Sequence, residues 1–515
     1  MNLERSCGIL LHITSLAGKF GIGTLGPEAR LFADTLERAG QRYWQVLPLG
    51  PIDKSYGYSP YASTSTFAGN WLFISLEKLA ENKWFSGDPG ADFPEGHFIP
   101  FDEVIKHKLP VLERACEDFF SKATDEDIKD YGRFCNDEAY WLDDFALYSS
   151  LVDELGSRNW LEWDSGISLR EPKALAQWSK KLGDKIRFHK FLQYQFFEHW
   201  AECKKYCNEL GIQIIGDIPI YVTMESADAW ANPGILLLDE KSRKPLSVAG
   251  VPPDYFSETG QRWGNPLYCW KKGNELSGET LRWWVKRITH LHKLVDLIRI
   301  DHFRGFEAYW SIPAEEKTAV LGKWIKGPGL QFFRSIRDEL GHLPLIAEDL
   351  GVITPAVEKF RDALGLPGMR ILQFAFDFNN KNLYLPHNID KQDCILYTGT
   401  HDNNTTNGWF YGSEIDDNTR KYILEYLGVD DFSDFHWKLI RQAYRSVARV
   451  VIIPAQDLLG YGEEFRMNRP GTTEGNWKWK LVRGSITDDI VERLKRMGRL
   501  YDRIRDAKRN QNQPN

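Results

Sequence analysis

Four carboxylates stand where short apolar runs of the chain end, and they are the first candidates for chemistry. They are Asp217 in IIGDIP, Asp301 in IRIDHF, Glu348 in IAEDLG and Asp402 in GTHDNN. A single acid at such a place commonly caps a helix or forms a salt bridge. Four acids that converge would repel each other and raise each other's pKa values, which a protein tolerates where its site uses them. The set predicts acid–base or nucleophilic chemistry.

The neighbours of these acids suggest separate roles. Arg299 lies two residues before Asp301, so on a strand both side chains share a face. The guanidinium would hold the pKa of Asp301 low and keep the carboxylate ionised, as a nucleophile requires. Glu348 follows three apolar residues, an environment that raises a carboxyl pKa and keeps a proton available. The histidine at 401 would present a donor beside Asp402, although histidines at strand ends are as often structural.

Two carboxyls with different pKa values, in a chain rich in aromatic residues, indicate cleavage of a glycosidic bond with retention. Asp301 would attack the anomeric carbon, and Glu348 would protonate the leaving oxygen and later deprotonate the acceptor. An inverting enzyme needs carboxyls roughly 6.5–9.5 Å apart, whereas a retaining one needs about 5–5.5 Å. The residues alone leave that alternative open.

Eight short apolar runs could position these acids. Continuous apolar runs of this length are typical of parallel strands buried on both faces. They occupy residues 7–12, 43–50, 212–220, 297–304, 345–350, 369–376, 394–402 and 447–456. Amphipathic stretches between several of them predict helices, at 28–40, 281–295 and 435–446, with a closing helix at 488–505.

Eight strands with helical connectors predict an α/β fold, a TIM (β/α)₈ barrel whose carboxyl-terminal strand ends form the catalytic face. The uneven spacing predicts large, mainly helical insertions after strands 2 and 3. We expect residues 1–71 and 211–515 to form the barrel, with a loop insertion at about 221–296. Residues 72–210 would form a mainly helical insertion subdomain. Residues 251–266 are dense in Pro, Gly and aromatics, which favours an ordered loop.

Composition excludes several classes of protein. The 515 residues are 42% hydrophobic with a net charge of −7 and no long basic run, so neither nucleic acid nor an anionic membrane is an expected partner. No apolar stretch is long enough to cross a bilayer, and no signal peptide is recognisable, so we expect a cytoplasmic protein. The 7 cysteines are scattered without metal-ligand spacing, which predicts a reducing compartment and no metal or cofactor.

Longer motifs carry a resemblance to a known family. They are SPY (59–61), GDIPIYV (216–222), VPPDYFSETGQRWGNPLY (251–268), RIDHFRGF (299–306), AEDLG (347–351), THDNNTT (400–406) and RMNRPGTTEGNW (466–477). With these motifs the chain resembles the amylomaltases, or 4-α-glucanotransferases, of glycoside hydrolase family 77 in the α-amylase clan. The motifs extend over nearly the whole chain, and the one at 251–268 is specific to this family.

The resemblance implies a role for each matching residue. Asp301 would be the nucleophile, Glu348 the general acid/base and Asp402 the third carboxylate, which stabilises the transition state. The other residues would bind substrate: Tyr61, Asp217, Arg299 and His401 on the donor side, Asp254, Phe256 and Trp263 in an arching loop on the acceptor side, and Asn468 as a further polar contact. One departure is Asn404, where many relatives carry Asp.

The predicted reaction is the transfer of α-1,4-glucan segments between maltooligosaccharides or starch-type chains, through a covalent glucosyl-aspartate. An arching aromatic loop would favour a sugar acceptor by binding it and excluding water. Glucan donors and acceptors, including glucose, would be the partners, and no cofactor is needed. An α-amylase-type hydrolase and a non-catalytic glucan-binding protein are the alternatives, and the oligomeric state stays open.

Overall fold

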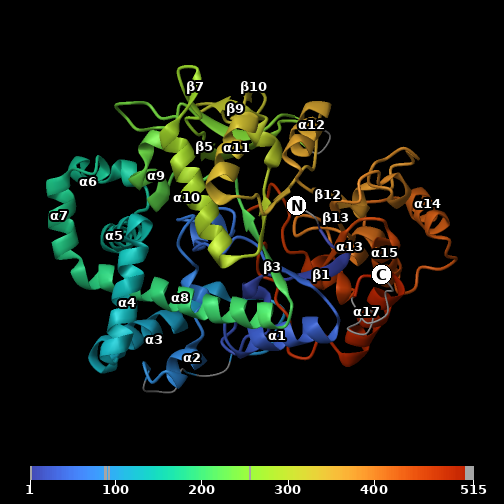
Figure 1. Cartoon of the computed structure of the whole chain (residues 1–515), viewed down its shortest axis with the longest axis horizontal. Coiled ribbons are helices and arrows are strands. Elements are labelled where there is room, and N and C mark those ends of the chain that lie inside the picture. Colours follow the sequence, from blue (N-terminus) through green and yellow to red (C-terminus); the bar gives the residue numbers. More distant parts are fainter. Residues whose placement is uncertain (1–2, 86–89, 91–92, 254–256, 505–515) are drawn as a thin grey trace, which may run out of the picture.

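The computed structural model describes residues 3–85, 90, 93–253 and 257–504. Its centre, where Figure 1 labels β1, β3, β12 and β13, is an eight-stranded parallel sheet whose strands pair in the order β11-β8-β3-β2-β1-β14-β13-β12. All eight predicted strands are present, each shorter than its apolar run. They are β1 (Ser6–Leu10), β2 (Tyr43–Gln45), β3 (Gln213–Ile218), β8 (Leu297–Ile300), β11 (Leu345–Ala347), β12 (Gly368–Ile371), β13 (Cys394–Tyr397) and β14 (Val450–Pro454).

The sheet curls into a nearly closed barrel. Its two outer strands, β11 and β12, meet where the Ala347 N–H donates to the Pro367 carbonyl at 2.9 Å. Every residue of β1, β8, β12, β13 and β14 is buried, as expected of strands covered by helices outside and by side chains inside. The predicted (β/α)₈ fold class is confirmed, and the carboxyl-terminal strand ends lie together on one face.

Amphipathic helices cover the barrel. In α15 (Phe435–Arg445) the side chains of Phe435, Leu439, Ile440 and Ala443 form one buried face. Helix α1 begins at Pro27, where the missing N–H of proline costs nothing, and ends at Arg38. The remaining cover consists of α10 (Gly278–Leu294), α11 (Gly329–Leu340), α12 (Pro355–Leu364) and α17 (Asp488–Leu500).

In the described residues between β2 and β3 lie the helices α2 to α8, and Figure 1 shows the middle ones, α3 to α7, extending to the left of the barrel. Their aromatic side chains pack on one another, as where Phe119 contacts the ring of Phe191 with centroids 5.4 Å apart. The Trp200 indole of α8 donates to the Leu294 carbonyl at 2.7 Å and ties these helices to α10. They are α2 (Leu76–Glu81), α3 (Phe101–Lys122), α4 (Asp125–Asp137), α5 (Ala139–Leu155), α6 (Ser165–Ser168), α7 (Pro172–Lys181) and α8 (Gly183–Glu209).

The insertion after β3 differs from the mainly helical one expected. Before α10, the described part of this insertion holds the short helix α9 (Ala227–Ala231), a 3₁₀ turn and the strands β4 (Ser247–Val251) and β5 (Gln261–Pro266). A small hairpin of β6 (Lys271–Lys272) and β7 (Glu275–Leu276) follows them. Strands β4 and β5 form a four-stranded antiparallel sheet with β9 (Ala308–Pro313) and β10 (Lys323–Lys326), which follow β8 in the chain. The order of this sheet is β10-β9-β4-β5. Pairing between distant segments forms this sheet, and local patterns do not reveal such pairing.

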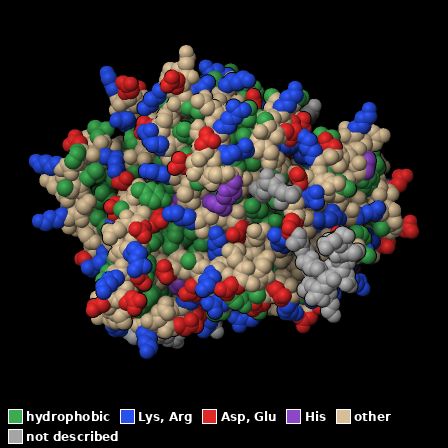
Figure 2. All heavy atoms as spheres, in the orientation of Figure 1, with side chains coloured by type: hydrophobic (Ala, Val, Ile, Leu, Met, Phe, Trp, Pro, Cys, Tyr) green, Lys and Arg blue, Asp and Glu red, His purple; other side chains and the backbone are tan. Residues whose placement is uncertain are grey.

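Charges of both signs are interspersed on the face shown in Figure 2, without a broad patch of one sign. Among the described residues, no helix has both the length and the apolar composition needed to cross a bilayer. Within the same ranges, no cluster of His, Cys, Asp or Glu side chains has the arrangement of a metal site.

Candidate active site at the carboxyl ends of the barrel strands

The barrel brings the four predicted acids to one face. Asp217 lies in β3, Asp301 directly follows β8, Glu348 follows β11, and Asp402 lies in the loop after β13. Backbone hydrogen bonds continue the parallel ladder through these positions: the Asp301 N–H donates to Ile218 and the Glu348 N–H to Ile300, each at 3.1 Å. The register of β3, β8 and β11 therefore places three of the acids side by side.

A single buried guanidinium joins two of these acids. Arg299 Nη1 donates to both oxygens of Asp217, at 2.8 and 2.6 Å, and lies 3.0 Å from Asp301 Oδ1. Asp217 Oδ2 also accepts the Tyr61 hydroxyl at 2.6 Å. The Arg299 and Asp217 side chains are almost fully buried, whereas the Asp301 side chain is 29% exposed. Asp301 is thus the member of this group that a substrate can reach.

The pKa of Asp301 differs from the sequence prediction. Burial raises this pKa well above its usual value, and the negative charges of Asp217 and Asp402 raise it further, while Arg299 opposes the rise. Arg299 lowers the pKa of Asp301 as expected, but the expected net result, a low pKa, is wrong. The reason is that Arg299 shares its one charge between Asp217 and Asp301, and desolvation exceeds the part left for Asp301. Arg299 nevertheless favours the ionised form of Asp301.

Glu348 is held by two backbone N–H groups. The His302 N–H donates to its Oε2 at 2.6 Å and the Leu350 N–H to its Oε1 at 3.1 Å. Burial, followed by the charge of Asp301, raises the pKa of Glu348, as the apolar run before it predicts. His302 adopts a left-handed backbone with φ of 50°, a strained conformation of the kind that concentrates at functional sites. That conformation aims its N–H at the carboxyl group.

Asp402 is fixed by its neighbours in sequence and space. Asn468 Nδ2 donates to Asp402 Oδ1 at 2.6 Å, and His401 Nε2 lies 3.4 Å from Oδ2. Burial lowers the pKa of His401, so its imidazole is neutral near pH 7. Arg466 Nη2 donates to the Asp402 carbonyl at 2.7 Å. Sequence reasoning did not single out Arg466, although it opens the quoted motif at 466–477.

Aromatic rings line the same face. Tyr61 stacks on His401 with centroids 5.0 Å apart, and Trp477, which the sequence analysis did not single out, lies 5.7 Å from Tyr61. Trp263, 39% exposed, meets the His302 ring edge-on at 4.9 Å. The structure thus brings the described predicted residues to one site. Two further predicted residues, Asp254 and Phe256, lie outside the described residues.

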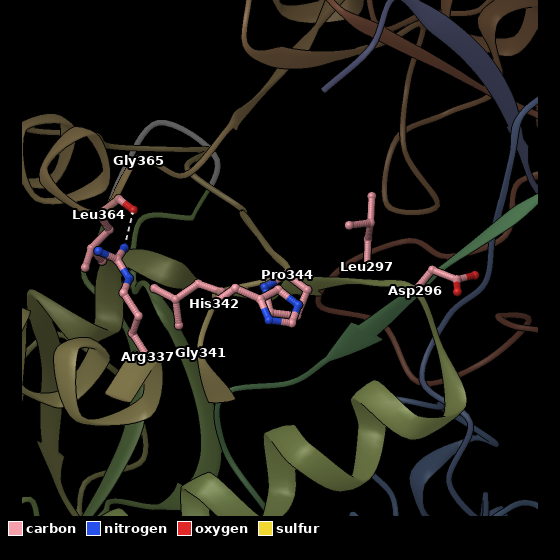
Figure 3. Close-up of a pocket in the computed structure, with 9 residues that line it drawn as sticks. Asp296, Leu297, Arg337, Gly341, His342, Pro344, Leu364 and Gly365 are labelled. Atoms are coloured by element: carbon pink, nitrogen blue, oxygen red, sulfur yellow. Dashed lines mark hydrogen bonds between the residues drawn. The ribbon is translucent and has the colours of Figure 1, made fainter. Parts of the chain in front are cut away.

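A separate cavity of about 500 Å³ opens at the opposite end of the barrel, beside the first residues of β8 and β11 (Figure 3). Its polar side chains serve the fold. Arg337 donates to the Leu364 carbonyl at 2.8 Å, and Asp296 accepts the Ile214 N–H at 2.7 Å. The amino-terminal end of such a barrel serves stability, so the acids on the other face are the better candidate for chemistry.

Comparison with known proteins agrees with this geometry. A family model described as 4-alpha-glucanotransferase matches residues 11–485. The chain belongs to the 4-alpha-glucanotransferase family. A 4-alpha-glucanotransferase from Thermus thermophilus is 46% identical over 511 residues, which cover 98% of this chain and 100% of that protein. One from Clostridium butyricum is 44% identical and covers 96% of this chain and 100% of its own length.

Solved structures of this family have the same fold. The amylomaltase from Streptococcus agalactiae, in complex with acarbose, matches with a TM-score of 0.92 at 36% identity, covering 98% of this chain and 100% of that one. The amylomaltase from Corynebacterium glutamicum matches with a TM-score of 0.76 at 18% identity, which shows a shared fold alone. The resemblance drawn from the motifs is confirmed, and the chain is an enzyme of the 4-alpha-glucanotransferase family.

Proposed function

We propose that this enzyme transfers segments of α-1,4-glucan between chains by double displacement, with Asp301 as nucleophile and Glu348 as general acid/base. The observation that supports this proposal most strongly is that the surroundings of two neighbouring carboxyl groups favour different protonation states. Arg299 contacts Asp301 at 3.0 Å and favours its ionised form, whereas burial and the negative charge of Asp301 raise the pKa of Glu348 and favour its protonated form. Retaining glycosidases need such a pair.

In the first step, an Asp301 oxygen bonds to the anomeric carbon of the donor as the bond from that carbon to the glycosidic oxygen breaks. Glu348 gives its proton to the leaving oxygen, and the shortened glucan departs with a free 4-hydroxyl. In the second step, the 4-hydroxyl of an acceptor attacks the same carbon, the bond to Asp301 breaks, and Glu348 takes the hydroxyl proton. One α-1,4 bond replaces another, so the reaction needs no energy source.

The other polar residues would hold the donor sugar. Asp402 would accept hydrogen bonds from ring hydroxyls and strengthen them in the transition state, because Asn468 and the neutral His401 already fix its orientation. Tyr61 would present its ring to the sugar face while its hydroxyl stays on Asp217. Asp217 and Arg299, being buried, would act mainly through Asp301.

Transfer instead of hydrolysis would depend on the segment 251–266. Trp263 in β5 is partly exposed and touches His302, the residue that follows the nucleophile. A sugar lying on Trp263 would approach the covalent intermediate with its hydroxyl oriented and would displace water from that side. We assign Asp254 and Phe256 to the same acceptor side on sequence grounds.

Maltotriose tests this proposal. Transfer yields glucose together with a ladder of longer maltooligosaccharides at an unchanged number of reducing ends. An α-amylase-type hydrolase yields shorter sugars alone, with reducing ends rising in step, and that result would refute the proposal. Binding of maltotriose without any product would instead indicate a non-catalytic glucan-binding protein.

The organisation of the chain also enters the proposal. Residues 1–71 and 211–515 would form the catalytic barrel, with the loop insertion at about 221–296, and residues 72–210 a helical subdomain that buttresses it. The partners would be maltooligosaccharides, amylose-like chains and glucose as acceptor. The 7 scattered cysteines, none of which forms a disulfide in the described residues, fit a reducing compartment such as the cytoplasm.

A further inference from the structure

A polar network lies behind Asp402, and Arg466 is at its centre. The Arg466 guanidinium is mostly buried and uses three nitrogens on three acceptors. Nε donates to the Asn468 carbonyl at 2.7 Å, Nη2 to the Asp402 carbonyl at 2.7 Å, and Nη1 lies 3.1 Å from Glu414 Oε1. Arg466 therefore binds the backbone carbonyls of both Asp402 and Asn468, whose side chains form a hydrogen bond with each other at Asp402 Oδ1.

Glu414 is in turn held by a buried amide. Asn404 Nδ2 donates at 2.8 Å to Glu414 Oε1, the oxygen that Arg466 also contacts. The backbone of Asn404 is fixed by Gln373, which donates to its carbonyl at 2.9 Å, and the whole residue is only 2% exposed. An ionised carboxylate only accepts hydrogen bonds, so the nitrogen of Asn404 must face Glu414. The amide type at position 404 therefore fits the carboxylate at position 414.

We propose that Glu414 and Asn404 are positioning residues for the reaction: Glu414 supplies the carboxylate that pairs with Arg466, and Asn404 orients Glu414. Through Arg466 they set the place of Asp402 and Asn468. The inference rests on the proposed role of Asp402 in the transition state.

Carboxylates at positions 404 and 414 together are incompatible with this network. The substitution N404D would turn an oxygen toward Glu414 at hydrogen-bonding distance, and two carboxylates so close cannot both stay ionised. Where both are ionised they would move apart, and the contact of Glu414 with Arg466 would weaken, whereas a proton shared between them would replace the hydrogen bond that Asn404 donates. Moving the carboxylate instead of adding one avoids the repulsion. In the double variant N404D/E414Q, the new amide at position 414 can donate to the new carboxylate at position 404, and the amide oxygen can still accept from Arg466.

The test compares N404D, E414Q and the double variant N404D/E414Q with the wild-type enzyme, by kcat and KM for maltotriose across pH. We expect N404D to lower kcat about tenfold above neutral pH with little change in KM, because a transition-state contact is disturbed. The ratio to wild type should approach one at acidic pH, where the carboxyl pair holds a proton. The double variant should recover most of the lost kcat.

E463Q is the matched control. Glu463 pairs with Arg469 and is 44% exposed, close to the 42% of Glu414, but its side chain has no hydrogen bond or ion pair with Arg466 and acts on it only by a weaker charge interaction. Its replacement should change kcat far less than E414A does. Thermal unfolding of each variant separates a positioning effect from loss of the fold. Because Glu414 is exposed, E414A should fold even where N404D does not, and its kcat should fall with KM nearly unchanged.

Two outcomes would overturn the inference. One is an unchanged kcat in both N404D and E414A. The other is a double variant no more active than N404D although it unfolds at the wild-type temperature. The variant D402N distinguishes failure of the inferred network from failure of the proposed function. An active D402N would remove the role of Asp402 itself, whereas an inactive D402N beside normal N404D and E414A would remove only the network.

Discussion

Replacing Asp217 by Asn tests how the positive charge of the buried Arg299 is divided between Asp217 and Asp301. Asp217 Oδ2 and Asp301 Oδ1 contact the same Arg299 nitrogen, at 2.6 and 3.0 Å, so the two oxygens lie within about 6 Å of each other. Two unit charges at about 6 Å interact by about 3 kcal/mol at an effective dielectric constant of about 20. The Asp301 side chain is 29% exposed, and solvent screening reduces this to roughly 1.4 kcal/mol, or about one pKa unit.

The direction of the effect follows from the charges. The negative charge of Asp217 raises the pKa of Asp301, so its removal lowers that pKa and leaves more of the Arg299 charge to Asp301. The nucleophile must be ionised, so the acid limb of the profile of kcat/KM against pH should move to lower pH by about one unit in D217N. Glucose release from maltotriose, measured as an initial rate across pH, gives this limb whatever the loss in absolute activity.

The matched control is D34N. Asp34 accepts a tyrosine hydroxyl, that of Tyr206, as Asp217 does that of Tyr61, but it lies on α1 outside the strand ends. Its replacement should leave the acid limb where it is. Thermal unfolding of D217N shows that the measurement is made on folded protein. An acid limb that stays in place or moves to higher pH in folded D217N would refute the shared-arginine reasoning.

Three further changes have definite expected outcomes. D301N should lose turnover by several orders of magnitude while its circular dichroism stays that of the wild type; near-normal kcat would remove Asp301 as nucleophile. W263A should raise the share of hydrolysis relative to transfer from maltotriose, and an unchanged ratio would contradict the role given to the 251–266 segment. Y61F removes the hydroxyl on Asp217 but keeps the ring on His401, so it should lower the free energy of unfolding by about 2 kcal/mol in chemical denaturation. An unchanged unfolding free energy would mean that this hydrogen bond contributes no net stability.

The barrel was predictable because each of its strands lies in a continuous apolar run that is visible in the local sequence. Runs such as VVIIP in β14 are apolar at every position, and burial on both faces is the simplest reason for that pattern. The antiparallel sheet was not predictable. Its strand β10, KWIK, is largely exposed and short, and it becomes a strand only by pairing with β9. Contacts between separate segments determine such strands, so no local period reveals them.

The same distinction applies to the site. The acids could be found because each one ends an apolar run, which fixes its place on a barrel. The pKa of Asp301 could not be found, because it depends on how one guanidinium is divided between Asp217 and Asp301 and on how deeply both are buried. Arg466 was also missed. Its motif was visible, but the contact of Arg466 with the Asp402 backbone joins residues 64 positions apart.

The central claim is that Asp301 carries the glucan between donor and acceptor. The most direct test uses E348Q with maltotriosyl fluoride as donor. Fluoride leaves without a general acid, so the first step proceeds, whereas the second lacks its base and the intermediate accumulates. Mass spectrometry of a proteolytic digest should then find a maltotriosyl group on the peptide that contains Asp301, and none on that peptide in D301N/E348Q. Fluoride release without an adduct at Asp301, or an adduct on another residue, would contradict the account.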